Sequence, residues 1–361
     1  MRVLKLNLKK RSYDILIGKG LLKSSGKYLR RLNIGSDAYV ITNSRIKKNY
    51  GAALTGALKR SGFTVRFKLV PDTEKSKSLQ AAADVIKDIA LYDKKRKIFI
   101  IAFGGGVVGD LAGFIASIYK RGVPYAHIPT TLLAQVDSGI GGKTAVDLSQ
   151  GKNLLGAFYQ PRLVISDVSA LKSLDARQVK NGLSEIIKYA VIKDAALFNY
   201  LEKNHKNILA LKDRALEFAV ARCSAIKARI VGMDEREEKG IRTILNFGHT
   251  IGHAIEAAGG FTAYNHGEAV ALGMLAASEI SVALGLTSEA ALKRIEKLIK
   301  AVGLPVKIKG ISSDKIIQAH YRDKKFSGAE NRFVLIEGIG KTRIVRNVPL
   351  EAVRRALKKR M

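Results

Sequence analysis

Ile98-Phe-Ile-Ile-Ala-Phe-Gly-Gly-Gly-Val-Val-Gly-Asp110 is the stretch that decides the fold. It begins with a continuously apolar run, which is typical of a strand buried on both faces of a parallel sheet. The glycines follow at once, and an apolar helical pattern comes next at residues 111–119. A strand, a glycine loop and a helix in this order let backbone N–H groups approach a pyrophosphate. The stretch therefore predicts an α/β nucleotide-binding domain.

The glycine spacing by itself is weak evidence for a cofactor. Gly104, Gly106 and Gly109 match the G-x-G-x-x-G pattern. However, the loop follows about the third predicted strand, and no acidic residue lies on a following strand at the distance of a standard dinucleotide fingerprint. A tight turn with close helix packing explains the same residues. The loop alone leaves both interpretations open.

The fold prediction extends outward from this stretch. Leu4, Leu6 and Leu8 alternate with polar residues and indicate a first strand. Further strands are predicted at residues 38–42, 65–69 and 163–166, and a helix at residues 76–91. Alternating strands and helices favour a mostly parallel, Rossmann-like sheet with covering helices. We assign residues 1–170 to this α/β domain.

The second half of the sequence has a different pattern. Helices are predicted at residues 176–190, 195–200, 213–231, 250–258, 266–284 and 288–302, with Asn204 as one boundary. One exception is a small hairpin predicted from residues 332–336 and 342–345, around Gly338 and Gly340. We assign residues 171–361 to a mainly helical, all-α type of domain that binds metal and substrate.

Composition limits the class of protein. The 361 residues, 47% of them hydrophobic, suffice for two domains with cores and exclude a disordered or fibrous chain. No apolar run is long enough to cross a bilayer, and residues 1–10 lack the apolar core of a signal peptide. The single cysteine, Cys223, excludes an internal disulfide and fits a reducing compartment. We expect a cytoplasmic protein without a membrane partner.

The net charge raises the alternative of nucleic-acid binding. The chain has 63 Lys+Arg against 31 Asp+Glu, a formal net charge of +32. The basic residues are nevertheless scattered, Trp is absent, and only residues 353–360 resemble a basic patch. We expect a solvated basic surface on an enzyme with an anionic substrate, and no specific nucleic-acid partner. Salt-sensitive binding to polyanions should remain.

A second glycine-rich segment suits the binding of phosphate and hydroxyl groups. Pro129-Thr-Thr-Leu-Leu-Ala-Gln-Val-Asp-Ser-Gly-Ile-Gly-Gly-Lys143 is followed by Gly151-Lys-Asn153. Each glycine turn supplies a lysine, and Asp137 is close by in the sequence. The end of the first turn resembles the tail of a P-loop, but the upstream glycine of that motif is missing. A Walker-type NTPase is therefore not predicted.

Three of the six histidines lie in one stretch of the helical half and suggest a metal site. His249 and His253 are four residues apart, on one face of a helix, and His266 follows shortly afterwards. With Glu185, two of these histidines form a two-His, one-carboxylate site with an open position. Hydrogen-bonded core histidines and a surface pair of Glu185 with Lys188 are the structural alternative. Spacing does not decide which two histidines bind the metal.

The sequence closely resembles 3-dehydroquinate synthases from about residue 71 to residue 340. The resemblance is carried, in order, by residues 71–77, 105–110, 120–122, 129–143, 151–153, 182–188, 245–253 and 266–270. It implies the dehydroquinate synthase-like fold, NAD, a zinc ion (or cobalt), a homodimer, and a sugar-acid phosphate as substrate. It implies Glu185, His249 and His266 as the metal ligands, which makes His253 a phosphate-contacting and proton-transfer residue.

The same resemblance implies the remaining site residues. The cofactor set is Asp72, Glu74, Lys77, Gly105, Gly106, Val107, Gly109, Asp110, Thr130, Thr131, Lys143 and Lys152. The catalytic and substrate set is Arg121, Asp137, Lys143, Asn153, Lys188, Lys227, Arg242, Asn246, His253 and Lys324. Three positions depart from the family pattern: Thr73 stands where a glycine is usual, Gly139 where a serine is, and Asp147 where an asparagine is.

The reaction that this family implies is the conversion of 3-deoxy-D-arabino-heptulosonate 7-phosphate to 3-dehydroquinate and phosphate, in the shikimate pathway. It proceeds by transient oxidation with NAD, loss of phosphate, re-reduction and aldol ring closure. Metal, cofactor and a basic cluster around the phosphate each suit one of these steps. The alternatives are another sugar-phosphate cyclase, or a metal-dependent polyol or glycerol-phosphate dehydrogenase.

Overall fold

The computed structural model describes residues 1–322 and 331–361, and it divides them into two compact units. The first unit comprises Met1–Asp175 and Leu216–Arg236, and the second Ala176–Ala215 and Glu237–Met361. The segment 216–236 thus belongs to the first unit, whereas the sequence assigned it to the helical domain. Its contacts explain the difference, because Lys227 and Ser224 on it bond to residues 135–137 of the first unit.

The first unit is built on a seven-stranded sheet in the order β1-β2-β9-β6-β5-β3-β4. All neighbouring strands are parallel except the first pair, β1 and β2. The strands are β1 Arg2–Leu6, β2 Tyr13–Gly18, β3 Asp37–Thr42, β4 Thr64–Leu69, β5 Ile98–Gly104, β6 Tyr125–Pro129 and β9 Leu163–Asp167. The predicted Rossmann-like sheet is confirmed.

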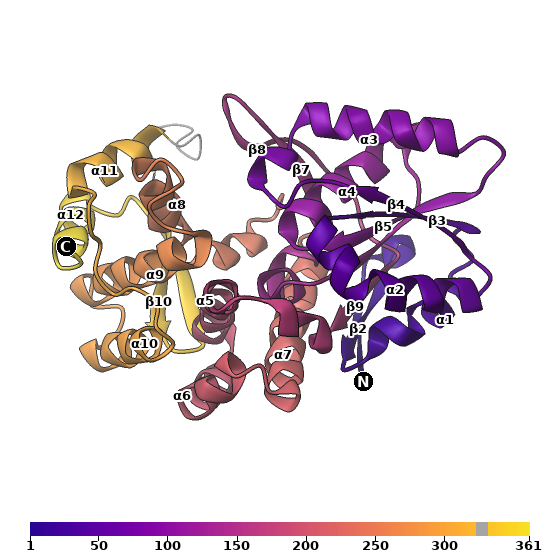
Figure 1. Ribbon diagram of the computed structural model, residues 1–361. Coiled ribbons are helices and arrows are strands. Elements are labelled where there is room, and N and C mark those ends of the chain that lie inside the picture. Colours follow the sequence, from indigo (N-terminus) through magenta and orange to yellow (C-terminus); the bar gives the residue numbers. More distant parts are fainter. Residues whose placement is uncertain (323–330) are drawn as a thin grey trace. The chain divides into compact units, whose positions relative to one another are not determined.

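Helices cover both faces of this sheet (Figure 1). On one face, α3 (Leu79–Tyr92) and α4 (Gly106–Ile118) pack against a core that includes Ile100. On the other, α1 (Ser25–Arg30) and α2 (Ser44–Arg60) pack against a core that includes Ile101. Consecutive residues of a strand point to opposite faces. The continuously apolar run of β5 therefore serves two cores at once.

The first unit also contains elements besides the main sheet and its covering helices. A separate hairpin is formed by β7 (Lys143–Leu148) and β8 (Gly151–Phe158). The helix α7 (Asp213–Met233) contributes residues 216–233 to this unit. A π-helical turn, Ala134–Ser138, follows β6. Because β7 begins at Lys143, no helix follows the second glycine turn, which agrees with the rejection of a P-loop.

The described residues of the second unit are helical apart from connecting loops and the hairpin of β10 (Arg332–Gly338) and β11 (Lys341–Arg346). Its helices are α5 Ala176–Lys193, α6 Ala195–Leu209, α8 His249–Ala258, α9 His266–Ala283, α10 Glu289–Ala301, α11 Ser313–Arg322 and α12 Leu350–Lys358. Nearly all of α9 is buried, and it contacts α5, α8, α10, α12 and β10. An apolar helix with no polar face belongs at the centre of a bundle, and α9 is that helix.

The carboxyl end of the chain is held in the second unit by charge. The Arg360 guanidinium contacts the Glu279 carboxylate, and its other nitrogen lies 2.9 Å from Glu296. Arg360 and Glu279 are both only 6% exposed.

Among the described helices, none is long and apolar enough to cross a membrane.

Candidate active site

Three helices of the second unit bring together a carboxylate and two imidazoles. Glu185 lies on α5, His249 begins α8, and His266 begins α9. The Glu185 Oε1 atom lies 3.4 Å from His249 Nε2 and 3.6 Å from His266 Nε2. The helices α8 and α9 approach closely because their contact contains glycine: a Cβ on Gly273 would lie 1.9 Å from the Gly248 carbonyl oxygen.

The start of α9 is fixed by local hydrogen bonds. The Asn265 side chain accepts from the Glu268 backbone N–H, and the Glu268 carboxylate accepts from that of Asn265, each at 2.9 Å. This capping box makes His266 the first helical residue. The ring of His266 is therefore placed by the backbone rather than by a mobile loop.

The geometry of the cluster fits a divalent metal. In a tetrahedral site with metal–ligand distances of about 2.1 Å, neighbouring ligand atoms lie about 3.4 Å apart. The separations of 3.4 and 3.6 Å from Glu185 Oε1 are close to this value. The Nδ1 atom of His249 lies 3.2 Å from the Phe247 carbonyl oxygen, which directs Nε2 towards the cluster. Two nitrogens and one carboxylate oxygen suit zinc or cobalt.

The electrostatics of the two rings differ. Burial lowers the pKa of the His249 imidazole well below its usual value, despite the charge of Glu185, so its Nε2 lone pair is available to a metal. Burial also lowers the pKa of His266, but the hydrogen bonds and charges of Glu185 and Glu256 outweigh it and raise that pKa to about 10. The two carboxylates therefore favour a cation at this point, whether a proton or a metal.

Two other predicted residues border the cluster. Lys188 is 1% exposed, and its ammonium contacts the Glu185 carboxylate one turn away on α5. The His253 ring lies 5.3 Å from that of His249 and 6.2 Å from that of His266. His253 shares a second group of facing atoms with Glu256 and His266, and is not in the group formed by Glu185. His266 belongs to both groups, and each group has the residue types of a metal site.

The glycine loop of the first unit lies between β5 and α4, at the helix N-terminus that phosphate binding requires. Gly105 precedes the helix, and Gly106, Val107, Gly109 and Asp110 form its first turns. Gly109 must be a glycine, because a Cβ there would lie 2.5 Å from the Cε1 atom of His127. His127 is buried under this loop, and the sequence analysis did not identify it.

Lys77 of the predicted cofactor set contacts one other member of that set and one predicted substrate residue. Its ammonium lies 2.6 Å from Asp110 Oδ2 and also donates to the Asn153 side chain. Lys152 lies 3.7 Å from Glu74. A further three lie apart from these contacts: Asp72 is exposed, Thr130 is fully buried after β6, and Thr131 Oγ1 accepts from the Ala134 N–H.

Among the predicted substrate residues of the first unit, Asp137 and Lys227 form a pair. The Lys227 ammonium lies 2.6 Å from the Asp137 carboxylate and 2.9 Å from its carbonyl oxygen. The two residues are 90 positions apart in the sequence. Arg121 has a positive φ of 63°, and Lys143 is exposed at the start of β7.

The remaining predicted residues belong to the second unit. Arg242 and Asn246 lie on the short helix Ile241–Asn246, and Arg242 is 2% exposed with its Nε 3.4 Å from Glu237. Lys324 lies outside the described residues. In the second unit, the described contacts join Glu185, Lys188, His249, His253 and His266, and Arg242 pairs separately with Glu237.

The three departures from the family pattern have local explanations. Thr73 has an extended backbone with φ −140°, so no glycine is required there. The Asp147 side chain accepts from the Asn153 N–H at 2.7 Å, a bond that an asparagine would also form. Gly139 is different, because a Cβ there would lie 2.6 Å from the Ala134 carbonyl oxygen. A serine at this position would require the π-helical turn to shift.

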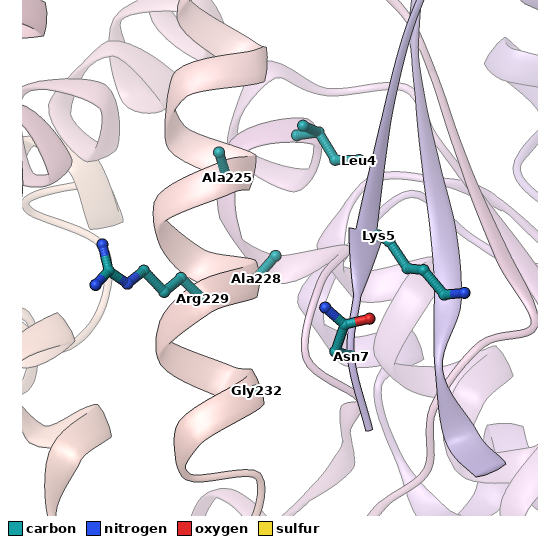
Figure 2. Close-up of a pocket in the computed structure, with 7 residues that line it drawn as sticks. All are labelled: Leu4, Lys5, Asn7, Ala225, Ala228, Arg229 and Gly232. Carbon is teal, nitrogen blue, oxygen red and sulfur yellow. The ribbon is translucent and has the colours of Figure 1, made fainter. Parts of the chain in front are cut away.

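A groove of about 370 Å³ lies elsewhere in the first unit, between β1 and α7 (Figure 2). It is lined by Leu4, Lys5, Asn7, Ala225, Ala228, Arg229 and Gly232, none of which is a predicted site residue. The charged ends of Lys5 and Arg229 point away from each other in Figure 2. They do not form an anion site.

Comparison with known proteins extends over nearly the whole chain. Residues 67–181 match the family model for the 3-dehydroquinate synthase N-terminal region, and residues 182–326 match that for the C-terminal region. The 3-dehydroquinate synthase of Desulforamulus reducens is 45% identical over 352 residues, covering 96% of this chain and 97% of the relative. That of Thermoanaerobacter pseudethanolicus is 42% identical over 358 residues, with coverage of 99% and 100%.

Solved structures of related cyclases share the fold. A 2-deoxy-scyllo-inosose synthase complexed with carbaglucose-6-phosphate, NAD+ and Co2+ has a TM-score of 0.90, 26% identity and full coverage of both chains. The 2-epi-5-epi-valiolone synthase of Streptomyces hygroscopicus, with NAD+ and Zn2+, has a TM-score of 0.88, 29% identity and 99% coverage of each. A probable glycerol dehydrogenase from Sinorhizobium meliloti, 16% identical with a TM-score of 0.61 and coverage of 96% and 95%, shares the fold alone.

Proposed function

Because the chain belongs to the 3-dehydroquinate synthase family, we propose that it converts 3-deoxy-D-arabino-heptulosonate 7-phosphate to 3-dehydroquinate and phosphate, a step of the shikimate pathway. The observation that carries this proposal is the identity of 42–45% with 3-dehydroquinate synthases over almost the full length of both chains. The solved cyclases that make an inosose or a valiolone are 26% and 29% identical. The sequence is thus nearer to the family that acts on the heptulosonate.

In this proposal the enzyme depends on NAD and on a divalent metal, zinc or cobalt. When bound, the metal polarises substrate oxygens, and NAD accepts and returns a hydride. Glu185, His249 and His266 would hold the metal, since Glu185 Oε1 lies at tetrahedral separations from both ring nitrogens and all three ligand atoms are within 4.8 Å of one another. The glycine loop from Gly105 to Asp110 would bind the NAD pyrophosphate at the N-terminus of α4.

The basic residues near these groups would bind the substrate anions. Lys188 contacts Glu185 and carries a buried positive charge beside the metal ligands, where it would face oxygen atoms of the substrate. His253 lies on the same helix face as His249 and would contact the phosphate and transfer a proton. We also propose substrate contacts from Arg121, Asp137, Lys143, Asn153, Lys227, Arg242 and Asn246, with Lys324 outside the described residues.

Charge at the site supports this use. Arg242 is almost fully buried, and a guanidinium removed from water is suited to binding a carboxylate or phosphate.

Lys188→Met and His253→Gln should lower kcat more than they raise KM, because these groups would act on the transition state. A rise in KM with unchanged kcat would argue against the proposed roles.

The test of the function is phosphate release from the heptulosonate phosphate by the purified protein. Release should require NAD in catalytic amounts, stop after chelation and resume with zinc or cobalt. A polyol or glycerol-phosphate dehydrogenase would instead accumulate NADH in proportion to substrate. If no phosphate appears with metal and NAD restored, hexose and sedoheptulose phosphates should be tried, which distinguishes the other cyclases.

We also propose the cytoplasmic location that the composition favours and the homodimer that the family resemblance implies. Size-exclusion chromatography with light scattering tests the dimer directly. A mass of about one chain, 39.3 kDa, at assay concentration would contradict it.

A further inference from the structure

Glu256 is a partly buried carboxylate that faces the metal cluster and has no role in the proposed function. It lies on α8, three residues after His253 and seven after His249. At 100° per residue these three side chains share one face of the helix. Glu256 Oε2 lies 3.6 Å from His266 Nδ1, and the Glu256 side chain is 12% exposed.

The ring of His266 is therefore bordered by a carboxylate at each nitrogen. Its Nε2 atom faces Glu185 at 3.6 Å, and its Nδ1 atom faces Glu256 at the same distance. Glu185 is the carboxylate that can share a metal with the ring, because it faces Nε2. Glu256 is placed to accept a hydrogen bond from the Nδ1–H, once the 3.6 Å separation shortens to hydrogen-bond distance.

The second histidine of the cluster has an equivalent arrangement. His249 Nδ1 lies 3.2 Å from the Phe247 carbonyl oxygen, so its Nε2 atom is the one that faces Glu185. Metal-binding histidines generally donate their other N–H to a carbonyl or a carboxylate, which fixes the tautomer and the ring orientation. For His266 the acceptor in this position is Glu256.

A purely structural role explains Glu256 poorly. The residue lies in the last turn of α8, where the helix dipole disfavours negative charge. Its side chain is only 12% exposed, and a carboxylate that is mostly removed from water is usually paired. A carboxylate kept at such a position has a specific partner, and the ring of His266 provides one.

We propose that Glu256 is a positioning residue for the metal site: it holds His266 with Nδ1 protonated and Nε2 directed at the metal. Its facing atoms also lie within 4.8 Å of those of His253, so it links the metal ligand to the proposed proton-transfer residue. This inference rests on the metal site of the proposed function. It adds a residue that none of the sequence motifs assigned.

The test compares Glu256→Ala, Glu256→Gln and Glu256→Asp with the unmodified protein. Zinc affinity is measured by competition with a chelating dye, and the visible spectrum of the cobalt-loaded protein reports ligand geometry. Glu256→Ala should weaken zinc binding about 10- to 100-fold. Glu256→Gln and Glu256→Asp retain an oxygen acceptor and should fall between Ala and the unmodified protein. The cobalt spectrum should change most in the Ala variant.

The control is Glu202→Gln, which removes a helical carboxylate that pairs with Arg294 on the surface of the same unit. It should leave zinc affinity unchanged. Circular dichroism of the metal-free Ala, Gln and Asp variants establishes that they fold, so loss of metal is not confused with unfolding.

Two results would overturn the inference, and they differ. If His249→Ala abolishes zinc binding but Glu256→Ala binds zinc within twofold of the unmodified protein, with the same cobalt spectrum, Glu256 does not position the ligand and the metal site stands. If the unmodified protein itself binds no stoichiometric zinc, the proposed metal site fails and the role of Glu256 fails with it.

Discussion

Acidification from pH 6.5 to 4 should destabilise the first unit through one side chain, the buried His127. The ring lies on β6, is 4% exposed, and its Nε2 atom has no hydrogen-bond partner among the described residues. Burial lowers its pKa from 6.5 to about 4, although a backbone hydrogen bond with Gly139 acts in the opposite direction. At about 1.4 kcal/mol per pH unit, this lowering corresponds to roughly 3 kcal/mol.

The sign follows from proton binding. Between pH 6.5 and 4 the unfolded chain takes up a proton at His127, whereas the folded protein does not. The free energy of unfolding therefore decreases as the pH is lowered from 6.5 to 4. The neutral ring makes its full contribution to stability only above pH 6.5. His127→Gln removes the titrating group, so the variant should lose less stability than the unmodified protein between pH 6.5 and 4.5.

Two measurements check this expectation. Urea unfolding of both proteins at several pH values gives the difference in slope. Histidine-selective NMR gives the pKa of the folded ring from the peak that disappears in His127→Gln, while His205→Gln, on α6, should leave that peak in place. The reasoning is wrong if this peak titrates near pH 6.5, or if the two proteins lose stability in parallel.

Further substitutions test other contacts. Gly109→Ala should cost about 1–3 kcal/mol and weaken NAD binding, because the new Cβ would lie 2.5 Å from the His127 ring; unchanged thermal melting and NADH fluorescence titration would contradict this steric argument. Asp147→Ala should cost roughly 1 kcal/mol, since the Asn153 N–H loses its acceptor. Asp147→Asn should cost less than about 0.5 kcal/mol. If urea unfolding shows that Asp147→Ala and Asp147→Asn lose the same stability, the hydrogen bond from the Asn153 N–H is unimportant. Arg360→Met should destabilise the second unit by roughly 3 kcal/mol, because it leaves the buried Glu279 carboxylate without its guanidinium; an unchanged melting temperature would rule this out.

The parts of the fold that could be predicted are those with one dominant signal. The strands at residues 98–103 and 163–166 are predictable because residues buried on both sides leave a continuous apolar run. The strand β6 is not, because it has only five residues, ends in Pro129 and runs directly into a motif that suggests a loop. The helix predicted at residues 195–200 continues through Asn204 to Leu209, since an asparagine is tolerated inside a packed helix.

The site is predictable in composition but not in geometry. Three histidines in one stretch indicate a metal, and the pair His249 and His253 is the obvious one on a helix. His266 reaches the cluster only because α8 and α9 touch at their glycines, a contact that no periodicity reports. Glu256 could have been found, since it continues the helical face of His249 and His253 by one more turn. His127 gives no comparable signal, because its importance comes from packing under Gly109.

Residues 216–236 belong to the first unit although they follow part of the second unit in the sequence, and this limits how the gene can be divided. A gene fragment that ends at Asp175 would encode Asp137 without Lys227, and Arg11 without its partner Glu235 at 2.6 Å. It would also lack the helix that covers one side of the groove beside β1. Each unit thus consists of two separate segments of the chain. Expressing the two halves of the gene separately, or joining halves at a single point, would therefore not reproduce either unit. A polypeptide intended to form the first unit must contain α7 together with the first 175 residues.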